Sequence, residues 1–327
     1  MFFSPLICKP LIGVSVMLCA LTTVQANGFP TAPIRLVIPF PPGGGADAVG
    51  RMLAQKLAAR LGQSVVVDNR AGANGSIGTS IVAKSPADGY TLLFTDRGAL
   101  GINPSLYKSL AYDPLKDFAY VGIAARSEYM LVQRASLPTR SVSALVTAAK
   151  GTSCKLNYAS FGTGSMPQLG MESFNAHYGT CITHVPYKGG GPALSATIAG
   201  EVDMTPVALS PAPPPIKSGR LIPIVIGGAQ RSSLLPQVPS ITEAAGPATL
   251  FPSTWFGFAY PQKTPAAIVK RLSEDIQQVL AMPDVRERLQ SEGFEIGSVD
   301  PVQMDREVDA DVRNFARELD RIGIRPE

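Results

Sequence analysis

The chain has 327 residues, of which 45% are hydrophobic, and this is enough to build two ordinary domains with filled cores. A disordered chain and a fibre are therefore excluded. Charged residues make up 17% of the chain and the formal net charge is +4, without any run of lysine and arginine, so nucleic acid is not an expected partner.

The N-terminal residues 1–26 have the features of a secretory signal peptide. Lys9 precedes an apolar stretch at 11–21, and residues 24–26 read Val-Gln-Ala, a small-x-small cleavage signal. The alternative is a membrane anchor, but the stretch has about half of the roughly 20 apolar residues that a spanning helix needs. We therefore expect cleavage after Ala26 and a mature chain in the periplasm.

Export determines how the cysteines are interpreted. Cys8 and Cys19 leave with the signal peptide, and the mature chain keeps Cys154 and Cys181. Two cysteines in an oxidising compartment favour a single disulfide. Each also precedes a predicted strand of one strand–helix–strand unit, which would place them side by side. Two separate buried thiols are the alternative.

Strands and helices alternate from the start of the mature chain. A strand-like run at 34–40 ends in prolines and glycines, and a helix with i, i+4 apolar spacing follows up to Gly62, which is placed to cap it. A second strand at 65–67 leads to a glycine-rich turn, a helix and a third strand at 90–94. Continuous β-branched runs between amphipathic helices are typical of a mostly parallel sheet covered on both faces, which predicts an α/β protein.

The same alternation restarts in the second half of the chain, so a second lobe is expected. Its strands are predicted at 156–160, 182–185, 202–205 and 221–226. The C-terminal part is helical. Because proline is favoured at the first helical position, three helices are expected to begin at Thr264-Pro265, Pro283 and Pro301.

A strand, a glycine-rich loop and a helix follow one another in both halves, at Phe40–Asp47 and at Ser160–Met166. Glycine lets the backbone approach a ligand closely, and the unpaired N–H groups at a helix start favour a carboxylate or a phosphate. Ser165 adds a hydroxyl that can cap the helix or donate to a ligand. The alternative is that these glycines only form tight turns.

The first loop also fits a different kind of site. Gly43–Ala48 matches G-x-G-x-x-A after a strand, and Asp68 ends the next strand where a ribose-binding acid would lie. A dinucleotide-dependent oxidoreductase is therefore the alternative function. The two prolines before the first glycine, the expected export and the second, similar loop count against it.

Few residues of the mature chain are suited to catalysis. His177 and His184 are its only histidines, and there is no H-E-x-x-H, C-x-x-C or G-x-S-x-G pattern. His184 is expected to pack or hydrogen-bond within the fold, and Trp255 to lie in the core. We therefore expect no enzymatic activity, no metal and no cofactor.

Seven short landmarks occur in one order over essentially the whole mature chain. They are Phe40-Pro41-Pro42-Gly43-Gly44-Gly45-Ala46-Asp47, Asn69-Arg70-Ala71-Gly72-Ala73, Asp88-Gly89-Tyr90-Thr91-Leu92-Leu93, Asn103-Pro104-Ser105-Leu106-Tyr107, Tyr112-Asp113-Pro114, His184-Val185-Pro186-Tyr187-Lys188-Gly189 and Trp255-Phe256-Gly257. Together they resemble the Bug-type receptors of the tripartite tricarboxylate transporter family. The resemblance implies a two-lobed, venus-flytrap fold of the type II periplasmic-binding-protein kind, with mixed, mostly parallel sheets and helices on both faces. Residues 27–126 and 253–327 are expected to form lobe 1, and residues 127–252 lobe 2.

The resemblance also implies a monomeric solute-binding protein that captures a small organic carboxylate between its lobes, for a membrane permease or a sensor. The expected ligand-binding residues are Phe40, Pro42, Gly43, Gly44, Thr95, Arg97, Gly162, Thr163, Gly164 and Ser165. A side chain on Gly164 is expected to fill space that the solute needs. The sequence departs from the family at Gln168, where histidine is common, and at Asp96-Arg97, which replaces a small polar pair. These departures leave the identity of the solute open.

Overall fold

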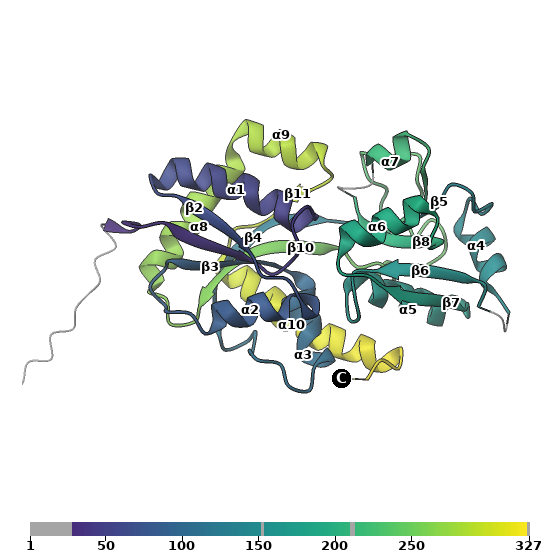
Figure 1. Ribbon diagram of the computed structural model, residues 1–327, viewed down its shortest axis with the longest axis horizontal. Coiled ribbons are helices and arrows are strands. Elements are labelled where there is room, and N and C mark those ends of the chain that lie inside the picture. The colour runs from purple at the N-terminus through teal and green to yellow at the C-terminus, as the bar shows by residue number, and fades with distance from the viewer. Residues whose placement is uncertain (1–27, 152–153, 210–212, 326–327) are drawn as a thin grey trace, which may run out of the picture.

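The computed structural model describes residues 28–151, 154–209 and 213–325, so the predicted signal peptide lies outside the described residues. The described chain forms two lobes that lie side by side, each built around one β-sheet with helices on both faces (Figure 1). The predicted two-lobed α/β fold is therefore confirmed.

Sheet A forms the centre of the first lobe. Within the described ranges its strand order is β11-β4-β10-β3-β1-β2. These strands are β1 (Ile34–Ile38), β2 (Val65–Asn69), β3 (Thr91–Asp96), β4 (Phe118–Ser127), β10 (Thr254–Pro261) and β11 (Glu295–Ile296). Strand β1 is parallel to β2 and β3, whereas β10 returns from the second lobe and is antiparallel to β3 and β4.

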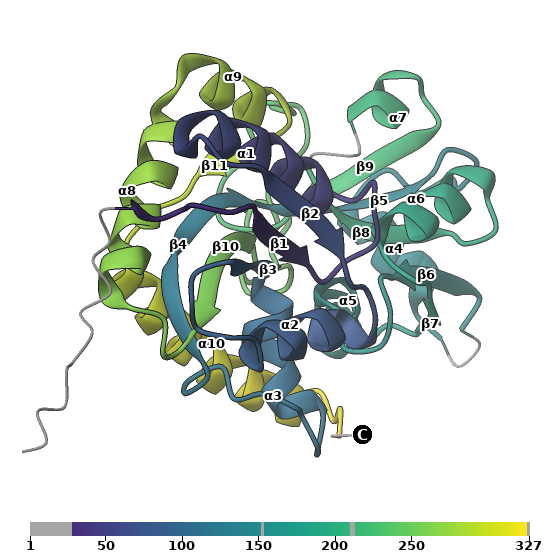
Figure 2. The same cartoon turned by 60° about the vertical axis from the view of Figure 1, so that its left-hand side comes forward.

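Helices cover both faces of sheet A (Figure 2). They are α1 (Gly45–Leu61), η2 (Ala73–Gly75), α2 (Ser76–Ala83), η3 (Gly98–Ile102), α3 (Asn103–Leu106), α8 (Ala266–Ala281), α9 (Pro283–Ser291) and α10 (Pro301–Arg321). Leu53 of α1 and Ile276 of α8 share one core with Phe94 of β3. Val308 of α10 shares the opposite core with Leu93, the preceding residue of β3, because successive side chains of a strand point to opposite faces.

The helix ends follow local sequence signals, with one exception. Gly62 adopts the left-handed conformation (φ +67) that ends α1, and its N–H donates to Ala58 O. Helices α9 and α10 begin at Pro283 and Pro301, as predicted. The prediction for α8 is wrong by one residue, because the extended ψ of 133° at Pro265 places this residue before the first helical turn.

Sheet B forms the centre of the second lobe, with the order β7-β6-β8-β5-β9 in the part of the chain that is described. Its strands are β5 (Tyr129–Arg134), β6 (Leu156–Ser160), β7 (Ile182–Pro186), β8 (Met204–Ala208) and β9 (Leu221–Ile226). The helices around it are α4 (Val142–Ala149), α5 (Met166–Tyr178), α6 (Gly190–Ala199) and α7 (Pro213–Lys217). Strand β6 is parallel to β7 and β8, and β5 is antiparallel to β8 and β9.

The predicted disulfide between Cys154 and Cys181 is present, with 4.9 Å between the two Cα atoms. The cysteines precede β6 and β7, and these strands pair in parallel with Leu156 opposite Ile182. The strand–helix–strand unit therefore brings the cysteines together, as the sequence predicted.

The chain crosses between the lobes at two neighbouring strands. Glu128 alone separates β4 of sheet A from β5 of sheet B, and the chain returns just before β10. Helix α10 also reaches across, because Phe315 and Leu319 near its end join the core of the second lobe (Figure 1). Ser173 of α5 donates to Glu318 Oε1 over 2.5 Å at the same contact. The exact residue ranges of the two lobes stay a prediction.

Candidate functional site

The loop between β1 and α1 begins at the carboxyl end of a central strand. Pro42 and Gly43 are exposed, and Gly43 has φ +84, a conformation that favours glycine. The first N–H groups of a helix have no partner within it. The backbone from Gly44 to Asp47 therefore presents a set of donors at the start of α1.

Asp47 organises this loop. Its carboxylate accepts hydrogen bonds from Gly43 N (3.0 Å), Arg51 Nε (2.9 and 3.0 Å) and Asn69 Nδ2 (2.9 Å). The same amide nitrogen of Asn69 donates to Phe40 O over 3.0 Å. Burial alone would raise the pKa of Asp47, but these hydrogen bonds and the charge of Arg51 hold it below its usual value. One donor of the loop, the N–H of Gly43, is thus already engaged by the protein.

Asp68, the acid that a dinucleotide site would require, already forms ion pairs within the protein. Asp68 on the edge strand β2 pairs with Arg35 (2.6 Å) and Arg70 (2.9 Å). Burial opposes ionisation, but both arginines hold the pKa of Asp68 below its usual value. Neither Asp68 nor the loop around Asp47 supports a dinucleotide site.

The loop between β6 and α5 has its own internal hydrogen bonds. Ser165 is buried and occupies the N-cap position of α5, but its hydroxyl donates to Gly162 O over 2.7 Å instead of accepting from the helix. Gln168 Oε1 accepts the N–H of Gly164 over 2.6 Å. Ser160 Oγ contacts both Gly162 N (3.1 Å) and His184 Nε2 (2.6 Å). Gln168 therefore occupies a backbone donor in the loop that was expected to bind the solute.

His184 and Trp255 have the structural roles that the sequence predicted. The ring of His184 also stacks on Tyr158, with 5.1 Å between centroids, and burial lowers the pKa of His184. Trp255 is buried, and its Nε1 donates to Asp311.

The lobes meet beside these two loops, and each loop contacts a neighbouring turn of the other lobe. Asn74 Nδ2, in η2 of the first lobe, donates to Gly164 O of the second over 3.1 Å. It also donates to Asn103 Oδ1 (2.9 Å), which fixes its orientation. On the other side of the contact, Pro41 Cγ lies 3.3 Å from the position that a Cβ atom on Gly189 would take. The loop after β6 thus contacts the turn after β2, and the loop after β1 contacts the turn after β7, so the carboxyl ends of the two sheets face each other, where open α/β sheets place their ligand sites.

The expectation for a side chain on Gly164 needs correction. A Cβ atom there would lie 1.7 Å from Leu106 Cδ2 of α3, and the φ of +78 at Gly164 would strain any other residue. The space next to Gly164 is therefore filled by a side chain of the other lobe. A substitution at Gly164 would first disturb the contact between the lobes.

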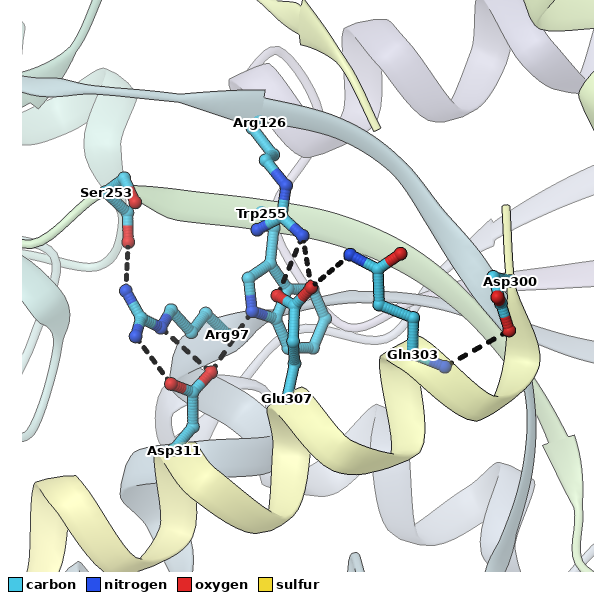
Figure 3. A network of polar contacts seen from close by, with 8 residues as sticks. All are labelled: Arg97, Arg126, Ser253, Trp255, Asp300, Gln303, Glu307 and Asp311. Carbon is cyan, nitrogen blue, oxygen red and sulfur yellow. Dashed lines mark hydrogen bonds and ion pairs between the residues drawn. The ribbon is translucent and has the colours of Figure 1, made fainter. Parts of the chain in front are cut away.

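Arg97 makes contacts within the protein (Figure 3). Its Nε and Nη2 donate to the two carboxylate oxygens of Asp311 in α10, over 2.8 and 2.5 Å, and its Nη1 donates to Ser253 O over 2.8 Å. The guanidinium also lies over the ring of Phe315, 5.1 Å from its centroid. All three guanidinium nitrogens thus have protein acceptors, and a contact between Arg97 and a solute stays a prediction.

Thr95 lies one strand residue before the end of β3. It is completely buried, and its hydroxyl has no hydrogen-bond partner among the described residues. Its role in binding also stays a prediction, as do the roles of the two loops.

The described ranges contain neither of two further kinds of feature, a metal site and a membrane span. No group of three or more His, Cys, Asp or Glu side chains there is arranged to hold a metal ion. No helix in these ranges has the length and hydrophobicity of a membrane span.

Comparison with known proteins identifies relatives along most of the chain. The family model described as "Tripartite tricarboxylate transporter family receptor" matches residues 49–324. Protein BugT of Bordetella pertussis is 36% identical over 275 residues, which cover 83% of each chain. A Pseudomonas protein named for the tcbD-tcbE intergenic region is 38% identical over 83% of this chain and 80% of its own.

Solved structures agree with this assignment. The adipate-bound Rpa4515 of R. palustris superposes with a TM-score of 0.87 at 35% identity, covering 91% of this chain and 100% of its own. The malate-bound MatC of Rhodopseudomonas palustris gives 0.84 at 30% identity, covering 89% and 100%. The periplasmic binding protein BugD gives 0.86 at 29%, covering 91% and 100%.

The two-lobed fold and these matches define a solute-binding protein of the periplasmic-binding-protein class. Within that class the chain belongs to the receptor family of the tripartite tricarboxylate transporters, with Bug-type relatives. The resemblance seen in the sequence is thereby confirmed.

Sequence reasoning missed residues that join the lobes, namely Asn74 and the side chain of Leu106. The signal was present, because Leu106 lies inside one landmark and Asn74 directly follows another. Their function was not evident, because both act on partners in the other lobe.

Proposed function

We propose that this chain is a periplasmic receptor that captures a small organic carboxylate between its lobes. The observation that carries the proposal is that the loops after β1 and β6 each contact the opposite lobe, Pro41 next to Gly189 and Gly164 O as the acceptor of Asn74 Nδ2. Unpaired N–H groups at a helix start stabilise an anion through hydrogen bonds and the helix dipole. The adipate and malate in the two related structures are both carboxylates.

The proposed binding groups are the backbone donors around Gly44 at the start of α1 and the loop from Gly162 to Ser165. Phe40, Pro42, Gly43 and Thr95 are proposed to line the same region. Closure of the lobes would exclude water and strengthen the contacts to the carboxylate. No step of this process needs catalysis, and we propose that the chain is not an enzyme.

The proposal also covers the export of the protein, its oligomeric state and its partner. Signal-peptide cleavage after Ala26 would give a mature N-terminus at Asn27, and the intact mass of periplasmic protein tests this. A mass that retains residues 11–21 would contradict it. We further propose that the mature chain is a monomer, checked by light scattering, and that its partner is a membrane permease or a sensor.

Calorimetry with a carboxylate panel tests the binding function. The panel is propionate, lactate, succinate, malate, aspartate, glutarate, glutamate and adipate, titrated into protein that has been unfolded and refolded to remove bound solute. At least one acid is expected to bind, whereas NAD is not. Binding of NAD without binding of any acid would contradict the proposal.

A proline at position 45 tests the start of α1 directly. Gly45 is the first residue of α1, a position that accepts proline, and the extended ψ of 171° at Gly44 suits a residue before proline. Gly45→Pro removes one backbone donor, which is worth about 1.5–3 kcal/mol toward a charged acceptor, or roughly 10- to 100-fold in affinity.

Gly45→Ala is the matched control. Its Cβ would lie 3.6 Å from Phe294 Cζ, an ordinary contact, and its N–H is retained. Equal affinity of the proline and alanine variants for the same acid would mean that the start of α1 does not bind the carboxylate.

A further inference from the structure

Asp96 is the last residue of β3 and lies next to the proposed binding loop. Strands β1 and β3 are parallel neighbours with Val37 opposite Leu93. Phe40 and Asp96 each follow this pair by three residues, at the carboxyl edge of sheet A. A carboxylate thus stands beside the loop that is proposed to bind an anion.

Other contacts place Asp96 at the junction of the lobes. Asp96 Oδ1 and Asn74 Nδ2 both lie within 4 Å of one point, the position that a Cβ atom on Gly98 would take. Asn74 is the residue that donates to Gly164 O in the second lobe. Burial, and after it the charge of Asp96, raise the pKa of Tyr129 on β5 of the second lobe, so this charge is felt on both sides of the junction.

No cation neutralises Asp96 among the described residues, where it makes no salt bridge. The adjacent Arg97 is directed instead to Asp311. Asp96 Oδ1 accepts the N–H of Ala99 over 2.9 Å, which orients the carboxylate at the start of η3. Burial raises the pKa of Asp96 to about 6, which is still below neutral pH, so the side chain of Asp96 is a carboxylate in most molecules at pH 7.

We propose that the solute of this chain carries a hydrogen-bond donor, an ammonium or a hydroxyl group, that binds the carboxylate of Asp96. This inference rests on the proposed function, since the loops would bind the carboxylate of the same molecule. A second, bare carboxylate directed to Asp96 would meet a like charge in a region of low dielectric constant. An ammonium group binds more tightly than a hydroxyl, because both partners are then charged.

The receptor is therefore selective for amino or hydroxy acids over the corresponding unsubstituted acids. Asp96 is then a residue that determines specificity. Asp96 also accepts the N–H of Ala99, which stabilises the start of η3, so loss of this hydrogen bond must be distinguished from loss of a contact with the solute.

Two sets of panel acids, each with one carbon chain, provide the test. Aspartate differs from succinate by an ammonium group and malate differs from it by a hydroxyl group, and glutamate differs from glutarate by an ammonium group. In each set, the parent protein is expected to bind the donor-bearing acid at least tenfold more tightly by calorimetry. Asp96→Asn keeps an oxygen acceptor for Ala99 and removes the charge, so the preference is expected to fall below threefold.

Asp300→Asn is the control for a merely structural role. Asp300 also accepts backbone N–H groups at a helix start, those of Val302 and Gln303, and it lies at the other end of α10 from the contact with the second lobe. This variant is expected to retain the full preference of the parent.

Equal binding of donor-bearing and donor-free acids by the parent would overturn the inference and leave the proposed function standing. A preference that survives in Asp96→Asn would overturn it as well. Failure of every acid in the panel to bind would instead count against the proposed function itself.

Discussion

The ion pair between Arg97 and Asp311 is expected to contribute strongly to stability. Only 20% of the Arg97 side chain and 5% of the Asp311 side chain are exposed, and the two carboxylate oxygens accept from Arg97 and from Trp255 Nε1 (Figure 3). Asp311→Ala would leave the guanidinium largely buried with Ser253 O as its remaining acceptor. Removing one partner of a buried pair costs about 3–5 kcal/mol, since an uncompensated charge stays behind.

The double variant separates the pair from its parts. Arg97→Met/Asp311→Leu removes both charges and keeps apolar volume, so it is expected to lose clearly less than the sum of the single variants. Urea unfolding followed by fluorescence measures this, and Trp255, the one tryptophan of the chain, reports on the same site.

An exposed pair provides the comparison. Lys270 and Glu274 on α8 are 3.9 Å apart, with 79% and 55% of their side chains exposed, so Lys270→Ala is expected to change stability by less than about 0.5 kcal/mol. A strong contribution of the Arg97–Asp311 pair is ruled out if Asp311→Ala costs no more than Lys270→Ala, or if the two single losses simply add in the double variant.

Three further predictions concern the disulfide, the crossing residue and the contact between the loops. Reduction of Cys154–Cys181, 27 residues apart, is expected to lower the free energy of unfolding by about 3 kcal/mol, and unfolding in urea with and without reductant measures it. Burial, and after it the charge of Glu295, raise the pKa of Glu128 from 4.5 to about 7. The folded protein therefore binds the proton of Glu128 more tightly than the unfolded chain does. As a result, the free energy of unfolding falls as the pH rises from about 4.5 to 7. Glu128→Gln removes this dependence, and its stability relative to the parent is expected to increase by at most about 3 kcal/mol between pH 4.5 and 8; two parallel pH profiles would contradict the assignment. Gly164→Ala is expected to separate the lobes and to enlarge the radius of gyration measured by small-angle scattering, and adding Leu106→Ala to the same chain is expected to reverse this. An unchanged radius of gyration in both variants would mean that the contact between Gly164 and Leu106 does not form in solution.

Much of the fold was predictable, because the signals that define it are local. The β-branched runs of β1, β2 and β9, the glycine that ends α1 and the prolines that open α9 and α10 act within a few residues of themselves. The disulfide was predictable for a related reason, since β6 and β7 are consecutive strands of one unit.

The contacts that were not predicted join residues far apart in the sequence. Arg97 has the chemistry of a carboxylate ligand, and only the fold brings Asp311, 214 residues away, to its guanidinium. Likewise, the sequence shows that Gln168 and Asp47 are polar residues next to glycine-rich loops. It does not show that Gln168 accepts the N–H of Gly164 and that Asp47 accepts the N–H of Gly43, because these hydrogen bonds depend on the backbone conformation of the loops. The sequence therefore indicated the loops of the proposed site, and the structure was needed to tell which of their donors already bind other groups of the protein.

The proposed function requires that N–H groups at helix starts bind the charged carboxylate of the solute between the lobes. The most direct measurement is a pair of calorimetric titrations, one with the panel acid that binds most tightly and one with its amide, in which the carboxylate has lost its charge. The amide is expected to bind at least 100-fold more weakly, because the N–H groups at the helix start then have no anion to stabilise. Binding of the amide as tightly as the acid would contradict the account.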